Sequence, residues 1–386
     1  MNRRIVQGGI VALAIAVSVS ACSSEGGAQA PNVTPLAAGS GPTVPYKLGT
    51  FEQGGQPILG LVLRDSQVVD IVKANEAFEA GNTAAAKLAA PADMKAIIAN
   101  YDSGWKDRLV EIAKAIPESG APSYVYAVDS LKALPPVHPN IVLNAGGNYS
   151  EHSNGIAANQ ARQGQRPAPT TPAVSAPGLW ERGEGDTREN PYLFIKSTSI
   201  MMGATDPIVM PRGRENIDFE CEFVTVIGKT AKYVPVSSAA DYIFGYTIEI
   251  DVSDRGGRGD RKMGGSDWLV GKNHDTFNPI GPVIVPKEFL AEPMNTRHTF
   301  TLNGEVMQDS NTSRMDHNIH ELLSFASNNL TLSPGDMIAG GSPAGTNIER
   351  AQPRWMRAGD KAVCTIEGIG QQVHDVVAEG GARSTN

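Results

Sequence analysis

Short runs of apolar residues mark the first folded part of the chain. Two of them, at positions 58–63 and 68–72, flank the polar turn Arg64-Asp65-Ser66, which is typical of β-strands joined by a tight turn. Residues 74–118 then change to helical spacing of apolar side chains. We therefore predict a small N-terminal α/β domain over residues 46–136, which ends at the proline-rich stretch 135–139.

From residue 137 to 386 the pattern is rich in β-strands punctuated by glycine and proline. Residues 153–190 interrupt it with a polar, Pro- and Gly-rich stretch that ends in charged residues. A loop of this length inside a compact domain is usually functional or disordered. We expect a lid over the site, in which Trp180 either lines the pocket or fastens the loop to the surface.

The first 21 residues have the features of an export signal. Arg3 and Arg4 precede a short apolar run at 10–17, which is too short to span a membrane. Small residues then lead to Cys22, as in a bacterial lipobox, although an ordinary signal peptide with an incidental cysteine is the alternative. Residues 22–45 are rich in Ser, Gly, Ala and Pro and are expected to form a flexible tether. The pattern predicts an exported protein that is lipid-anchored to a bacterial membrane, and no other membrane contact.

Composition narrows the class of protein. The chain of 386 residues has 33 basic and 41 acidic side chains, a net charge of −8, and no clustered basic face. Nucleic acid is therefore excluded as a partner. Besides Cys22, only Cys221 and Cys364 are present, both in apolar alternating stretches. We expect two buried free thiols there, with a disulfide as the alternative that an oxidising compartment allows.

Carboxylates alternate along two predicted strands. Glu220 and Glu222 share one face of the first, and Glu249 and Asp251 share one face of the second. Neighbouring carboxylates repel each other unless a cation lies among them, and a hard divalent ion prefers oxygen ligands. The pattern indicates either a metal site or a solvated strand face that carries acids.

Several short motifs, in this order and spacing, resemble the fumarylacetoacetate hydrolase family over residues 46–380. They are Asn148-Tyr149-Ser150-Glu151-His152, Phe194-Ile195-Lys196, Asp218-Phe219-Glu220-Cys221-Glu222-Phe223, Gly245-Tyr246-Thr247, Asp251-Val252-Ser253-Asp254-Arg255, Gly271-Lys272, Asn303-Gly304-Glu305, Pro334-Gly335-Asp336 and Gly341-Ser342-Pro343-Ala344-Gly345. The resemblance implies an α+β fold with a C-terminal mixed β-sheet domain, a small N-terminal domain, and a homodimer. It also implies a divalent metal, most often magnesium with manganese or calcium as alternatives, held by Glu220, Glu222 and Asp251.

The resemblance also suggests roles around the metal. Lys272 matches a lysine that stabilises negative charge on an enolate oxygen, and Arg255 matches a position that supports the site or binds substrate. Tyr149 and Ser342 are further candidates for substrate binding, the latter where a threonine is common. His152 is the candidate general base, because imidazole titrates near neutral pH.

The partner of His152 is left open by the sequence. Many members of the family place a glutamate three residues after this histidine, where this chain has Gly155. A carboxylate from elsewhere would have to replace it, and the candidates are Glu349, Glu181, Glu184 and Glu189. Together with Arg258, near a position where several members have a substrate-binding glutamine, these departures indicate a divergent substrate.

Two functions follow from these residues. The first is a metal-dependent hydrolase or lyase that acts on a 2-oxo acid or 1,3-dicarbonyl compound through an enolate, by C–C bond hydrolysis, decarboxylation, hydration or isomerisation. The alternative is a tethered binding protein for an acidic small molecule that has lost turnover together with the missing glutamate.

Overall fold

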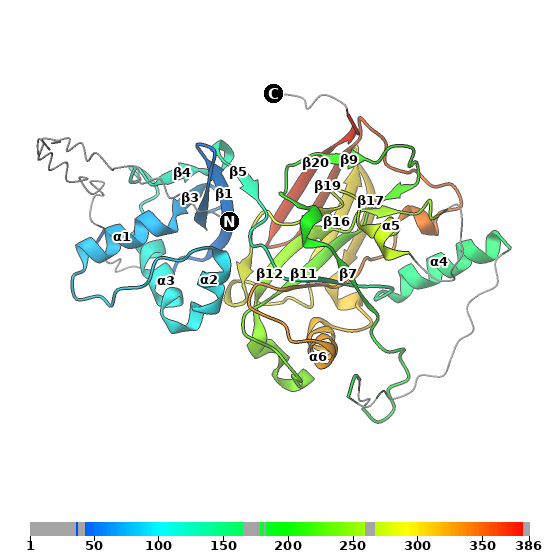
Figure 1. Ribbon diagram of the computed structural model, residues 1–386, viewed down its shortest axis with the longest axis horizontal. Coiled ribbons are helices and arrows are strands. Elements are labelled where there is room, and N and C mark those ends of the chain that lie inside the picture. The colour runs from blue at the N-terminus through cyan, green and yellow to red at the C-terminus, as the bar shows by residue number, and fades with distance from the viewer. Residues whose placement is uncertain are drawn as a thin grey trace, which may run out of the picture. The chain divides into compact units, whose positions relative to one another are not determined.

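The computed structural model describes residues 36–37, 43–164, 176, 178–180, 183–258 and 267–380 (Figure 1). The predicted export signal, Cys22, most of the tether and part of the predicted lid lie outside these residues. Residues 34–386 form one compact unit. The boundary at residue 136 therefore stays a prediction. No helix in the described ranges has the length and apolar character needed to cross a bilayer.

The N-terminal part is a five-stranded antiparallel sheet with helices packed on it (Figure 1). The predicted strands and helices are present, but the second apolar run leaves the sheet at Asp70. The reason is local: the Asp70 carboxylate accepts hydrogen bonds from the backbone N–H groups of Val72 and Lys73, so the helix begins at residue 71. The elements are β1 (Tyr46–Gln53), β2 (Gln56–Leu63), β3 (Gln67–Asp70), α1 (Ile71–Gly81), α2 (Met94–Ala99), α3 (Trp105–Ala115), β4 (Val125–Ala127) and β5 (Lys132–Leu134).

A six-stranded mixed sheet forms the centre of the C-terminal part, in the order β15-β12-β11-β18-β6-β7. Only the β18–β6 pair is parallel; the other neighbours are antiparallel. This arrangement confirms the expected α+β fold with a mixed sheet. The strands are β6 (Val142–Ala145), β7 (Leu193–Lys196), β11 (Cys221–Ile227), β12 (Ile243–Ile250), β15 (Val285–Pro286) and β18 (Met337–Ala339).

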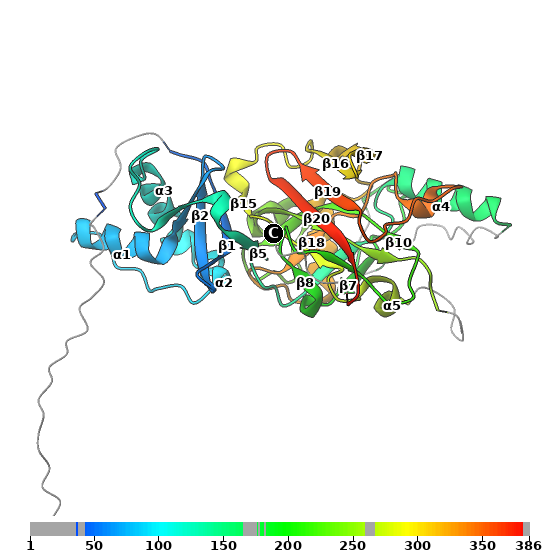
Figure 2. The ribbon, with the colours of Figure 1, turned by 90° about the horizontal axis from the view of Figure 1, so that it is seen from above.

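A second five-stranded sheet covers one face of the first, and β19 and β20 cross over it in Figure 2. The alternation predicted for the strand around residue 221 explains the packing: its apolar side chains face this second sheet, and the ring of Phe219 stacks on Phe300 at 4.1 Å. The strands, in the order β17-β16-β19-β20-β9, are β9 (Ile208–Met210), β16 (Arg297–Leu302), β17 (Glu305–Asn311), β19 (Lys361–Ile366) and β20 (Gly370–Ala378).

Three α-helices and four short strands, together with seven short 3-10 helices along the chain, complete the described fold. The loop expected from residue 153 onward is partly helical, because α4 extends through residue 162. His152 and Asn159 lie seven residues apart on one face of α4, and both contact the segment around residue 349, which supports the helix. The elements are α4 (Ser150–Arg162), α5 (Trp268–Lys272), α6 (Ile319–Asn329), β8 (Met201–Met202), β10 (Ile217–Asp218), β13 (Ser253–Asp254) and β14 (Asn278–Pro279).

Cys221 and Cys364 form a disulfide between the two packed sheets. The expectation of two free thiols is therefore wrong. Both residues are buried, as predicted, but β11 and β19 face each other, and the Cα–Cα distance of 5.6 Å is in the range of a disulfide. The two cysteines are 143 residues apart, so only the packing of the sheets brings them together.

Candidate active site

Three carboxylates meet at the end of the antiparallel pair β11–β12. Glu222 lies in β11, Glu220 just before it, and Asp251 just after β12, where its N–H donates to the carbonyl of Glu220 at 2.8 Å. One oxygen of each carboxylate lies within 4.8 Å of the others. The exposed fractions of Glu220, Glu222 and Asp251 are only 4%, 1% and 1%. The alternative of a solvated acidic strand face is therefore wrong.

Three cations surround this carboxylate cluster. The Lys272 ammonium donates to Glu220 at 2.5 Å and also to Asp251. The Arg255 guanidinium donates to Glu220 at 2.5 Å and to Asp218 at 3.3 Å. Lys196 is fully buried and donates to Asp251 at 2.5 Å. The structure thus brings the predicted Lys272 and Arg255 onto the predicted metal ligands.

The cluster holds more negative than positive charge. Beside the three carboxylates of Glu220, Glu222 and Asp251, two further buried carboxylates join it, Asp218 and Glu249. Five carboxylates against the cations of Lys196, Arg255 and Lys272 leave two negative charges unbalanced when all are ionised. A divalent cation would balance them, so the donor set fits such an ion.

Individual pKa values reflect this imbalance. Burial, followed by the charges of Asp251, Glu249 and Glu220, raises the pKa of Glu222 well above its usual range. Burial acts in the same direction on Glu220, but Arg255 and Lys272 outweigh it and hold the pKa of Glu220 well below its usual range. Burial also raises the pKa of Glu249 to about 7. Glu222 is therefore the carboxylate whose ionised form an added cation would stabilise most, because no close cation among the described residues pairs with it.

His152 lies between this cluster and one more carboxylate. It lies in the first turn of α4, and its Nδ1 lies 2.5 Å from the Oε1 of Glu349. Its Nε2 points the other way and lies 3.6 Å from the Oε1 of Glu220. The side chain is buried. Of the four candidates for its partner, the structure brings Glu349 to it, whereas Glu184 and Glu189 are exposed and Glu181 lies outside the described residues.

The segment after the Gly-Ser-Pro motif holds Glu349 in place. Its Oε1 accepts hydrogen bonds from the Thr346 hydroxyl at 2.7 Å and from the Gly345 N–H at 3.2 Å. Burial would raise the pKa of Glu349, but the hydrogen bonds from His152, Thr346 and Gly345 outweigh it, and the pKa is lowered. An ionised Glu349 then orients the His152 ring, which leaves Nε2 free to face the cluster.

The remaining predicted residues contact groups outside the carboxylate cluster. Tyr149 is buried, and its hydroxyl lies 3.5 Å from His298 Nε2. Ser342 is buried and its hydroxyl accepts from Gln308 Nε2 at 2.9 Å. Arg258 is exposed and pairs with Asp267 at 2.9 Å. Trp180 is buried against His317 and Phe325 of the α6 region, at ring distances of 5.7 and 6.3 Å, so it fastens its segment there.

Sequence reasoning missed two members of the cluster, Lys196 and Asp218, and gave Glu249 only a shared strand face with Asp251. The first two stand in motifs quoted above, and Glu249 alternates with Asp251, so a signal was present for each. The sequence does not predict that these residues are buried, because strand alternation shows which side chains share a face but not whether that face is covered. Lys196 reaches the cluster from β7, at the far edge of the sheet.

Comparison with known proteins identifies the class that this fold and site define. Residues 143–377 match the family described as fumarylacetoacetate hydrolase, C-terminal. An uncharacterized protein of Pyrococcus abyssi is 41% identical over 191 residues, which are 50% of this chain and 81% of that protein. The chain therefore belongs to the fumarylacetoacetate hydrolase family.

Relatives whose names describe an activity match this chain either over a smaller share of their own length or at a lower identity. The mitochondrial oxaloacetate tautomerase FAHD2A of Bos taurus is 39% identical over 191 residues, which are 49% of this chain and 60% of that protein. The crystal structure of maleylpyruvate hydrolase from Sphingobium sp. SYK-6 is 25% identical, with a TM-score of 0.61, and covers 86% of this chain and 99% of that one. The family thus includes proteins described as tautomerases and as hydrolases.

Proposed function

We propose that this protein is a divalent-metal-dependent enzyme that removes a proton next to the carbonyl of a 2-oxo acid or 1,3-dicarbonyl compound and passes through an enolate. The observation that carries the proposal is the position of His152, which is held by Glu349 on one side and faces the carboxylate cluster on the other. A base beside a site for negative oxygen is what enolate chemistry requires.

Glu220, Glu222 and Asp251 would hold the metal, and the negative charge left in the cluster supports this fit. A bound divalent ion would supply Lewis-acid stabilisation of the developing negative oxygen. Magnesium is the ion we propose, with manganese or calcium as alternatives, since all three prefer oxygen ligands.

The chain's own groups would move and hold the proton. His152 would accept the carbon-bound proton, or one from water, at Nε2, while the ionised Glu349 stabilises the imidazolium that results. Lys272 would turn from its carboxylates toward the enolate oxygen, and Arg255 would keep Glu220 ionised. Returning the proton to another carbon or oxygen of the substrate would complete a tautomerisation or isomerisation. In a C–C hydrolysis His152 would instead take its proton from water, whose oxygen adds to the second carbonyl. The C–C bond then breaks, the acyl part leaves as a carboxylic acid, and the departing enolate takes back the proton from His152.

The 39% identity to an oxaloacetate tautomerase supports oxaloacetate as the first substrate to test, and the maleylpyruvate hydrolase fold supports acylpyruvates as the second. Tautomerisation, decarboxylation and hydrolysis should be measured with magnesium or manganese present. His152→Ala should lower kcat at least about 100-fold and Asp251→Ala should abolish metal dependence. An exposed histidine variant, His138→Ala, is the matched control. Wild-type protein that turns over none of these compounds at any rate above the variants would contradict the proposal.

The alternative function, a binding protein without turnover, requires that His152 lacks a carboxylate partner. Glu349 contacts the His152 ring, and this contact supports the enzyme. A homodimer, export and lipid anchoring through Cys22 remain part of the proposal. Size-exclusion chromatography with light scattering tests the first, and metabolic labelling with a palmitate analogue, compared with Cys22→Ala, tests the others.

A further inference from the structure

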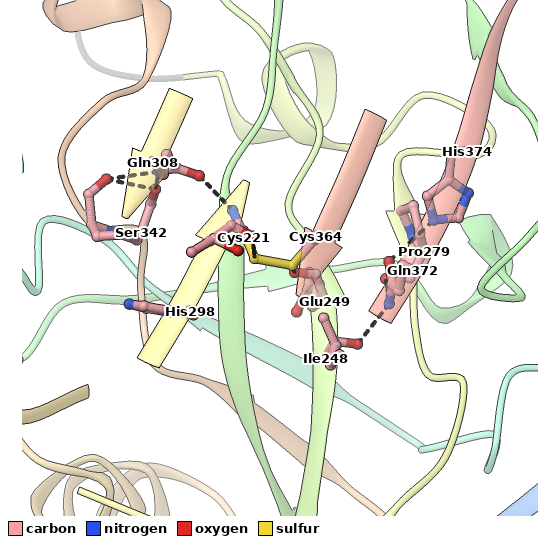
Figure 3. Close-up of a disulfide and its surroundings, with 12 residues drawn as sticks. Cys221, Ile248, Glu249, Pro279, His298, Gln308, Ser342, Cys364, Gln372 and His374 are labelled. Carbon is pink, nitrogen blue, oxygen red and sulfur yellow. Dashed lines mark hydrogen bonds between the residues drawn. A yellow bond between two sulfur atoms is a disulfide. The ribbon is translucent and has the colours of Figure 1, made fainter. Parts of the chain in front are cut away.

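One cysteine of the disulfide is the sequence neighbour of two proposed metal ligands. Cys221 stands between Glu220 and Glu222, and alternation turns its side chain to the opposite face, where it bonds to Cys364 of β19 (Figure 3). Both cysteines are at most 1% exposed. The one disulfide between the two packed sheets in the described part of the chain therefore begins at the residue that separates two proposed ligands.

The backbone at Cys221 is held by a second contact. Its N–H donates to the Gln308 side chain at 3.0 Å, and the same Gln308 donates to the Ser342 hydroxyl at 2.9 Å (Figure 3). Gly341, next to Ser342, donates its N–H to the Glu222 carboxylate at 2.9 Å. Cys221 is thus tied to β19 by its side chain and to β17 by its backbone.

At this end β11 has a paired strand on one side only. Among the described pairings, β11 pairs with β12 from Cys221 onward, but its register with β18 begins only at Val224. The residues that carry the ligands therefore have a strand neighbour on one side only. The ligand oxygens of Glu220, Glu222 and Asp251 also lie within 4.8 Å of one another, and like charges at this distance repel.

We propose that the Cys221–Cys364 disulfide is a positioning device for the metal site, so that the oxidised chain binds a divalent cation more tightly than a chain without the link. This inference rests on the proposed function, because it requires that Glu220, Glu222 and Asp251 hold a metal. The link fixes the Glu220–Glu222 segment against the second sheet and keeps the ligand oxygens within reach of Asp251. A dithiol would undo the link by reducing it to the two cysteine thiols; it supplies the two electrons and two protons and itself becomes a disulfide.

The test is a calorimetric titration with manganese of the wild type and of Cys221→Ala/Cys364→Ala. The dissociation constant for manganese should rise about 10-fold or more when the disulfide is absent, as it does when residues that hold metal ligands in place are substituted. Ile366→Ala is the matched control, since Ile366 is a buried residue of β19 that bonds to neither cysteine. It should lose a comparable free energy of unfolding and bind manganese as the wild type does. If the alanine pair does not fold, Cys221→Val/Cys364→Ala fills more of the space and takes its place.

Each result has a distinct meaning. Equal manganese affinity with and without the disulfide would overturn the inference, and so would an equal loss in Ile366→Ala, which would make the effect one of general stability. Wild-type protein that binds no manganese would overturn the proposed function as well. Activity gives a second readout: the link's removal should raise the metal concentration for half-maximal rate more than it lowers kcat at saturating metal.

Discussion

Gly155 leaves the space that the Glu349 side chain occupies beside His152. A Cβ atom at Gly155 would lie 2.7 Å from Glu349 Oε2 and 2.9 Å from its Cγ, which is closer than side chains pack. Gly155 is three residues after His152 on α4, and Glu349 arrives from a segment almost 200 residues further along the chain. The carboxylate that orients the histidine and the glycine that admits it therefore form one unit.

This relationship predicts the outcome of an exchange. Glu349→Gln should lower kcat about 100-fold, because an amide stabilises an imidazolium poorly, and Gly155→Ala should also lower it by displacing Glu349. Gly155→Glu/Glu349→Gly moves the carboxylate to α4, one turn from His152, and should recover part of the lost rate. Steady-state kinetics on all four proteins checks this. A double variant no faster than Glu349→Gln would show that the position of the carboxylate, and not only its presence, is required.

Glu222→Gln should have opposite effects on the metal-free and metal-loaded protein. Burial and neighbouring carboxylates raise the pKa of Glu222, so above the ordinary glutamate range the unfolded chain releases a proton that the folded chain keeps, and the stability of the metal-free fold falls as the pH rises toward this raised pKa. Removing the charge should raise the midpoint of thermal unfolding without metal. It should also remove most of the stabilisation by manganese, about 2.7 kcal/mol at 100 times the dissociation constant.

The matched control for this variant is Glu305→Gln, an exposed glutamate of β17. It should leave both midpoints close to those of the wild type. A lower midpoint of metal-free Glu222→Gln would contradict the excess of negative charge on which the metal site is argued.

His374 should make the fold sensitive to acid. Burial lowers the pKa of His374 from 6.5 to about 4. As the pH falls below 6.5 the unfolded chain binds a proton that the folded chain does not, so the stability present above pH 6.5 is lost as the pH approaches 4. Over that window the loss is about 3 kcal/mol.

Urea unfolding of the wild type and His374→Gln between pH 7 and 4 measures this difference. The free energy of unfolding of the wild type should fall more steeply than that of the variant. His138→Gln, at an exposed site, should follow the wild-type curve. Parallel curves for the wild type and His374→Gln would mean that the buried imidazole is already protonated in the folded state.

Trp180→Ala should lower stability with little effect on catalysis. The indole is 5% exposed and packs against His317 and Phe325, so its removal should cost about 3 kcal/mol in free energy of unfolding. The value of KM should stay unchanged if Trp180 only fastens its segment. Leu179→Ala, at a side chain that is 42% exposed, is the control. A rise in KM for Trp180→Ala alone would restore the other role predicted for this residue, that of lining the pocket.

The lid predicted over residues 153–190 is tested separately, since α4 occupies its first part and several of its residues lie outside the described ranges. Deleting residues 165–175 leaves α4 and Trp180 intact. If the segment shelters the site from water, kcat should fall while the thermal midpoint changes little. Unchanged kinetics would remove the lid from the mechanism.

The sequence by itself determined the family, the α+β class and most of the residues that meet in the carboxylate cluster. It could do so because strand alternation is local: Glu220 and Glu222 share a face wherever the strand lies, and the same holds for Glu249 and Asp251. Short motifs in fixed order added Lys272 and His152. These features depend on neighbours in the chain, which a sequence displays directly.

Only the tertiary structure decided which distant residues meet. The choice of Glu349 as the partner of His152, the entry of Lys196 into the carboxylate cluster and the bond between Cys221 and Cys364 each join segments 55 to 197 residues apart. Burial was also decided there: the second sheet covers the apolar face of the strand, whereas His152 from α4, Lys272 from α5 and Lys196 from β7 contact the acidic face that the pattern alone leaves open to solvent. The acidic face therefore became a buried site, and two cysteines expected to be free became the link behind it.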